Sequence, residues 1–97
     1  MFMKIHRSPD CPEVVAVCDR ELINTTHRTE TMTVAISAGF YGTTEVTEAQ
    51  VQEALKNAGN INLMGERAVS VAVAMGLIDR KSCIMIGTIP HAQVYQL

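Results

Sequence analysis

The sequence predicts a small α/β fold, with α+β as the alternative, and three observations support this prediction. Segments with the two-residue period of strands lie near both ends of the chain, within residues 2–18 and 83–97. Between them, residues 47–75 have helical periodicity. The length of 97 residues suits one domain, so we expect residues 1–97 to form a single domain. We expect a two-layer sandwich of about four to five mixed strands, with about two to three helices mainly on one face of the sheet.

The N-terminal segment predicts a β-hairpin followed by a helical turn. Residues 2–7 alternate between two faces, and residues 14–18 are apolar on both faces, which is typical of a central strand. Residues 8–12 separate them as a turn, because two prolines and an aspartate cannot continue a ladder. Asp19 is then expected to cap a short helix that begins at Arg20.

A strand, a loop and a helix are predicted next. Residues 31–36 alternate as a strand does, and residues 39–42 contain two glycines and two aromatic residues, which favour a loop. Thr47 and Gln50 have the spacing of a capping box, and Gly59 suits the left-handed residue that ends a helix. The apolar face of this helix is formed by Val51, Ala54, Leu55 and Ala58.

The last part of the chain predicts a buried helix and two short strands. The helix covers residues 63–75, with Asn62 as its N-cap and Gly76 just beyond its C-terminus. After a charged turn, residues 83–86 predict a strand, and residues 92–97 predict a final strand at the edge of the sheet. Gly87 and Pro90 are expected to bend the chain between these two strands.

Composition excludes several classes of protein. Eight Lys and Arg against ten Asp and Glu give a net charge of −2, which is not the strongly basic balance typical of nucleic-acid-binding domains. The charge is uneven, however: the middle of the chain is acidic, and the two ends hold all three histidines. These ends would form a modest basic patch if they met in space.

Cysteine use and the N-terminus indicate the compartment. Cys11, Cys18 and Cys83 are odd in number and include no C-x-x-C pair, so we expect neither a disulfide framework nor a metal site. The first residues lack the apolar core of a signal peptide, and residues 68–78 are too short to cross a bilayer. We therefore expect a cytoplasmic protein that does not contact a membrane and needs no cofactor.

Two segments are candidates for a binding site. Asn62, Gly65, Glu66 and Arg67 stand at a predicted helix start, where backbone amides can bind an anion. Helix capping and close packing explain the same residues, and no phosphate-loop motif is present. The second segment contains Pro90, His91 and Gln93, and the last two share a face because they stand two residues apart on a strand.

A catalytic thiol is the remaining candidate. Cys18 lies where a strand gives way to a helix, and a helix N-terminus lowers the pKa of a thiol. Completion of an apolar strand explains the same residue without any chemistry.

The chain resembles the archaeal family catalogued as domain of unknown function 424. The resemblance implies a small, stand-alone archaeal protein of the cytoplasm with an α/β core, and it implies no activity. Restriction to archaea favours a role in RNA handling or translation. The stretches that carry the resemblance are Lys4-x-His6-Arg7, Glu13 to Asp19, Phe40-Tyr41-Gly42, Asn62-Leu63-x-Gly65-Glu66, Val69, Ala72, Gly76-Leu77-Ile78, Ile84-x-Ile86 and Ile89 to Gln93.

The sequence is compatible with three functions. The first is a non-catalytic binding module for RNA or a ribonucleoprotein partner. The second is a small enzyme that uses Cys18 or His91. The third is a homodimer or subunit that pairs through a sheet edge at residues 94–97. The contact face of the binding module would comprise Lys4, His6, Arg7, Arg67, His91 and Gln93.

Overall fold

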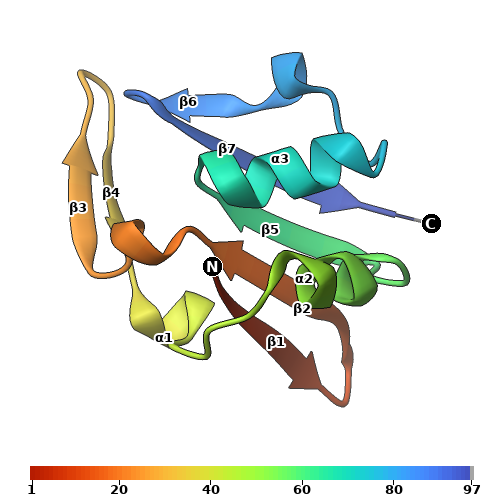
Figure 1. Ribbon diagram of the computed structural model, residues 1–97. Helices are drawn as coiled ribbons and strands as arrows, with labels where there is room; N and C mark the ends of the chain where they lie inside the picture. The colour runs from red at the N-terminus through yellow and green to blue at the C-terminus, as the bar shows by residue number, and fades with distance from the viewer. Residues whose placement is uncertain (97) are drawn as a thin grey trace.

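The computed structural model describes residues 1–96 and contains one five-stranded mixed sheet (Figure 1). Only β2 and β5 run parallel, and each other neighbouring pair is antiparallel. Hydrogen-bonded hairpins and one crossover therefore build the sheet. Its strands, in spatial order, are β1 (Phe2–Ser8), β2 (Cys11–Cys18), β5 (Asn60–Met64), β7 (Ile89–Tyr95) and β6 (Ile84–Ile86).

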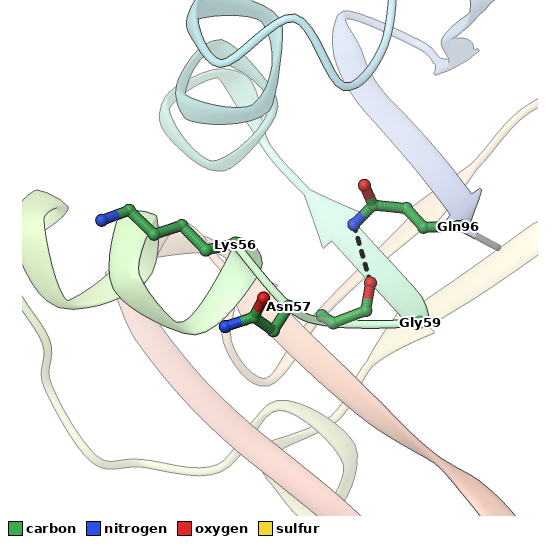
Figure 2. Close-up of a pocket in the computed structure, with 5 residues that line it drawn as sticks. Lys56, Asn57, Gly59 and Gln96 are labelled. Atoms are coloured by element: carbon green, nitrogen blue, oxygen red, sulfur yellow. Dashed lines mark hydrogen bonds between the residues drawn. The ribbon is translucent and has the colours of Figure 1, made fainter.

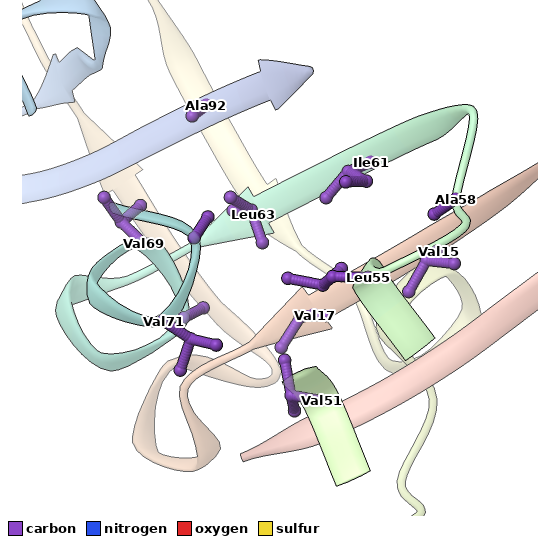
Figure 3. Packing of buried hydrophobic residues seen from close by; sticks show 12 residues of the cluster. Val15, Val17, Val51, Leu55, Ala58, Ile61, Leu63, Val69, Val71 and Ala92 are labelled. Atoms are coloured by element: carbon purple, nitrogen blue, oxygen red, sulfur yellow. The ribbon is translucent and has the colours of Figure 1, made fainter. Parts of the chain in front are cut away.

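Two helices cover one face of the sheet, which we call the helix face. These are α2 (Glu48–Leu55) and α3 (Glu66–Ala74), which lie beside each other over β2, β5 and β7 (Figure 1). Their apolar side chains close the larger hydrophobic core with the alternate residues of those strands (Figure 3). Its buried members include Val15, Val17, Val51, Leu55, Ile61, Leu63, Val69, Val71 and Ala92.

The opposite face, which we call the hairpin face, is partly covered by a second, two-stranded sheet. Strands β3 (Thr25–Arg28) and β4 (Thr33–Ile36) form this hairpin, and the single helical turn α1 (Ala38–Tyr41) follows it. Buried residues of the hairpin and of α1 pack against the sheet in a smaller core. Its members are Ala16, Cys18, Ile36, Tyr41, Met64 and Ile86.

Several elements confirm the predictions. The fold is a single-chain α/β sandwich with five strands in its main sheet and two of three helices on one face. The N-terminal hairpin forms as expected. Thr47 and Gln50 make both bonds of the capping box: the Gln50 amide donates to Thr47 Oγ1 at 3.2 Å, and the Thr47 amide donates to Gln50 Oε1 at 2.8 Å.

The predicted link and helix start at residues 60–64 are wrong, because Asn60–Met64 is the central strand β5. Asn62 is therefore not an N-cap, and the helix begins at Glu66 rather than at Leu63. Ile61 and Leu63 of β5 point to the helix face, whereas Met64 belongs to the smaller core on the hairpin face, so the strand alternates between the two faces. Only Gly65, Glu66 and Arg67 separate β5 from the apolar part of α3, and this short interval hid the change of period.

Other boundaries differ as well. Strand β3 was not predicted, because its polar residues offer only a weak alternating pattern. Pro12 lies inside β2, where its missing amide is tolerated close to the strand end. Strand β7 begins at Ile89 and lies between β5 and β6, so it is not the edge strand that we expected. The final residue of that prediction, Leu97, lies outside the described residues.

Asp19 has a different role from the predicted one. Its side chain makes no capping bond to the 3-10 turn Arg20–Leu22. It is 3% exposed, and its two carboxylate oxygens accept the amides of Arg67 at 3.0 Å and Ala68 at 2.9 Å. These are the orphan amides of the first turn of α3, whose own N-cap, Gly65, has no side chain.

Gly65 must be a glycine for two reasons. Its φ of 109° belongs to a region that L side chains avoid. A Cβ atom at this position would stand 2.4 Å from Asp19 Cγ, far inside van der Waals contact. The close approach of Gly65 and Asp19 thus joins the end of β2 to the start of α3.

We predict that Gly65→Ala lowers the free energy of unfolding by about 3 kcal/mol, because it adds steric overlap to an unfavourable φ. The matched control is Gly76→Ala, where φ is 75° but no atom lies within 4 Å of the new Cβ. That control should cost about 1 kcal/mol. Urea unfolding curves measure both, and equal losses would contradict the role given to the Asp19 contact.

Candidate functional site

The two candidate segments lie side by side on adjacent strands. Asn62 of β5 faces Gln93 of β7, and Met64 faces His91. At the end of the pair, the Gly65 amide donates to the carbonyl of Pro90 at 2.9 Å. Residues 25 to 31 positions apart in the chain are therefore direct neighbours.

The alternation of β7 sorts its residues between the two faces. Pro90 is buried, and its neighbour in the same orientation, Ala92, belongs to the core of the helix face. His91, Gln93 and Tyr95 point to the hairpin face, and we call these three residues the β7 strip. Gln93 is exposed and Tyr95 is 68% exposed, so the β3–β4 hairpin leaves this end of the sheet open.

His91 is the oriented member of the β7 strip. Its Nδ1 lies 2.8 Å from the carbonyl oxygen of Leu63. A carbonyl only accepts, so Nδ1 carries the proton and donates. In the neutral form of the ring, Nε2 is then the acceptor, and the bond at the other nitrogen holds it in a fixed direction.

Asn62 lies on the same face of the sheet as the β7 strip, but its side chain is hydrogen-bonded to a residue of α1. Its Oδ1 accepts from the Tyr41 hydroxyl at 2.6 Å, and burial raises the pKa of that hydroxyl well above its usual range. The Asn62 side chain is half-buried. We therefore assign it a positioning role between α1 and β5.

The helix start at residues 65–67 does not form an anion site. The carboxylate of Asp19 already occupies the amides of Arg67 and Ala68. The Arg67 guanidinium donates to Glu21, and Glu66 accepts from Arg80 Nη1 at 2.9 Å. The expectation of an anion or backbone ligand at this helix start is therefore wrong, because an internal carboxylate satisfies it.

The predicted patch at the two chain ends does not form either. His6 lies on β1, which is separated from β7 by the two strands β2 and β5, and its ring stacks on Phe40 with centroids 4.8 Å apart. Its Nε2 donates to the Phe40 carbonyl at 2.6 Å. Arg7 pairs with Glu13 at 2.8 Å near the turn of the first hairpin. His6 and Arg7 thus make contacts within the N-terminal half and do not join the β7 strip.

Cys18 does not have the properties of a nucleophile. Its side chain is completely buried, and desolvation together with the neighbouring Asp19 raises its pKa to about 12. Its Sγ donates to the Asp19 carbonyl at 3.2 Å. The thiol therefore stays protonated at neutral pH, opposite to the activation that the sequence position suggested.

A hollow of about 300 Å³ lies away from all of these residues. Figure 2 shows it between the segment after α2 and Gln96, the residue that follows β7. The Gln96 side-chain amide donates to the carbonyls of Leu55 and Ala58. None of the sequence-predicted site residues lines the hollow; its lining consists of Lys56, Asn57, Ala58, Gly59 and Gln96.

Within residues 1–96, no three His, Cys, Asp or Glu side chains gather as a metal site would require. The same part of the chain contains no helix that is long and apolar enough to cross a membrane.

Sequence reasoning missed two residues of importance. Tyr95 continues the alternation of His91 and Gln93 by one further step, so the period of the strand could have found it. The contact of Asp19 with α3 had no local signal, because the two are joined only by the fold.

Comparison with known proteins identifies the family. A family model described as "Protein of unknown function (DUF424)" matches residues 6–97. The chain is also similar to the crystal structure of an uncharacterized conserved protein from Methanopyrus kandleri, with a TM-score of 0.80 and 29% identity. The similarity covers 97% of this chain and 89% of that one. No curated protein matches the sequence. Because the family model spans nearly the entire chain, this protein belongs to the DUF424 family, as its sequence motifs indicated.

Proposed function

We propose that this protein is a non-catalytic binding module of the cytoplasm, and that its β7 strip contacts single-stranded RNA. The observation that supports this proposal is the common orientation of His91, Gln93 and Tyr95 on the open end of the hairpin face. These side chains offer an aromatic ring, an amide and an imidazole acceptor in one row, at spacings of two residues.

The chemistry of the strip suits unpaired bases. A base can stack on the exposed ring of Tyr95, and the Gln93 amide can both donate to and accept from the edge of a neighbouring base. His91 adds an acceptor at Nε2, fixed in direction by its bond to Leu63. Such contacts read splayed bases and do not require a duplex.

Electrostatics limits the strength of this binding. Most arginines are paired with carboxylates, and the net charge is −2. Few cations are therefore left to contact phosphates, so we expect affinity to come from stacking, with a weak salt dependence. The paired arginines are Arg7, Arg20, Arg67 and Arg80, whose partners are Glu13, Glu45, Glu21 and Glu66.

The small-enzyme alternative has less support. Cys18 is buried and protonated, as described above. His91 donates to a backbone carbonyl, and no carboxylate is bonded to its ring among the described contacts. A general base of the usual kind is oriented by such a carboxylate and stands beside a nucleophile.

We predict that Tyr95→Ala weakens binding of a short single-stranded RNA about 5- to 150-fold, since stacking contributes about 1–3 kcal/mol per base. Tyr95→Phe, which keeps the ring, should bind within about twofold of the unchanged protein. Fluorescence anisotropy with a labelled mixed-sequence oligonucleotide at low salt measures both variants.

Met32→Ala is the control, because Met32 is another exposed side chain but lies on the β3–β4 loop. The slope of log affinity against log salt should be about −1 to −2, which corresponds to about two phosphate contacts. Absence of binding at low salt, or an equal loss in Tyr95→Ala and Met32→Ala, would overturn the RNA proposal. The binding-module proposal would then be reduced to a module that binds only the protein component of a ribonucleoprotein.

We predict that the Cys18 thiol resists alkylation in the folded protein at pH 8. With a pKa of about 12, about one molecule in 10⁴ carries the thiolate at that pH. Cys11 is exposed and should react readily under the same conditions. Mass spectrometry of peptides after iodoacetamide treatment, with and without urea, locates the label.

The raised pKa of Cys18 also makes the stability of the folded protein depend on pH. The pKa of Cys18 is higher in the folded state than in the unfolded chain, so its contribution to stability is complete below about pH 9 and is lost as the pH rises toward 12.

Rapid alkylation of Cys18 in the folded protein at pH 8 would restore the enzyme alternative.

A further inference from the structure

The two edge strands of the main sheet differ in what covers them. At β1, the Met3 amide donates to the Thr44 carbonyl at 3.2 Å, and the Val46 amide donates to the Met1 carbonyl at 2.9 Å. The segment before α2 therefore shields the start of this edge. No described residue makes a backbone hydrogen bond to the outer side of β6.

The backbone of Met85 points out of the sheet at this open edge. Met85 is paired with Pro90 of β7, and the Pro90 carbonyl accepts the Gly65 amide on the β5 side. In an antiparallel strand the amide and carbonyl of one residue point to the same side, so Pro90 turns its backbone away from β6. The amide and carbonyl of Met85 consequently face outward, where no described residue bonds them.

The side chains of this edge are apolar and exposed. Ile84 is 58% exposed and Met85 is 55% exposed, and they stand on opposite faces of the strand. Strand β6 contains no charged residue. Natural edge strands are usually protected from pairing by short length, a lysine, a proline or a bulge, and of these β6 has only its length of three residues.

We propose that β6 is a self-association edge, at which a second copy of this chain pairs through its own β6 in antiparallel orientation. A two-fold axis at Met85 lets each copy donate its Met85 amide to the other's Met85 carbonyl. Ile84 of each copy then lies opposite Ile86 of the other. The two five-stranded sheets become one continuous sheet.

The geometry favours a second copy as the occupant because the edge is self-complementary. One residue supplies both the outward donor and the outward acceptor, so the two-fold satisfies both at once. The nearest charges, on Arg80 and Lys81, precede the strand and do not face each other in this register, and Arg80 is already bonded to Glu66. Charge repulsion therefore does not oppose the pairing.

The size of the contact sets its strength. Two exposed apolar side chains per copy fall far short of the about 800 Å² per partner that a stable complex buries. The dimer should therefore be weak and should form only at high protein concentration.

This inference also relocates the edge contact expected from the sequence. The expected contact used residues 94–97, but β7 is paired with β5 and β6, whereas β6 lies at an edge of the sheet.

The first test is sedimentation velocity from about 10 µM to about 1 mM protein. We expect the sedimentation coefficient of the unchanged chain to rise with concentration. Met85→Pro should abolish this rise, because it removes the outward amide, which bonds to no other residue within 1–96. An unchanged urea midpoint of Met85→Pro confirms that it folds, and Met32→Ala serves as the control for loss of an exposed methionine.

The second test traps the register and does not depend on the strength of the dimer. In a background with Cys11→Ser and Cys83→Ala, Met85→Cys places two thiols directly opposite each other, at a Cα separation of about 5.5 Å that suits a disulfide. Ile84→Cys places its thiols two residues out of register, so its cross-linking should be at least about tenfold slower.

Three results would overturn the proposal: a monomer at every concentration, a dimer that survives Met85→Pro, or equal cross-linking rates for Met85→Cys and Ile84→Cys. The RNA-binding variants do not touch β6, so these results are independent of the proposed function.

Discussion

Two backbone amides at the start of α3 are satisfied by a carboxylate that lies 48 and 49 positions earlier in the chain. Asp19 follows the last residue of β2, and its own amide donates to the Met64 carbonyl at 3.0 Å. One residue thus connects the end of β2, the end of β5 and the first turn of α3. Because a buried carboxylate without partners is very costly, these three elements must form together. Gly65 belongs to the same constraint, since any side chain there would displace Asp19.

This arrangement decides which chemistry the molecule offers. A free helix N-terminus beside the carboxyl ends of two parallel strands is a common place for an anion to bind. Here Asp19 fills that place from inside, and the arginine next to it is paired with Glu21. What remains open is the end of the hairpin face, with the β7 strip on one strand and the uncharged β6 at its edge. Both are exposed, and they are the surfaces that the two proposals above use.

The success of the sequence predictions depended on how local the relevant signal was. The capping box of Thr47 and Gln50 needs only four consecutive residues, and it was predicted correctly. The hairpin of β1 and β2 needs only one turn, and it was also found. By contrast, β5 was mistaken for a link and a helix start, because only three residues, at positions 65–67, separate it from the apolar part of α3. Among the candidate site residues, His91 and Gln93 remained together on one face, while His6, Arg7, Glu66 and Arg67 proved to be engaged in contacts elsewhere.

The sequence by itself determined the family, the α/β class and the periodicity that puts His91 and Gln93 on one face of a strand, because these depend on neighbouring residues and short motifs. Only the tertiary structure decided that Asp19 caps α3, that Cys18 is buried and protonated, and that β6 rather than the last strand is the free edge. The physical reason is the same in each case. Burial, hydrogen-bond partners and strand order are relations between segments far apart in the chain, and no periodicity along the sequence encodes them.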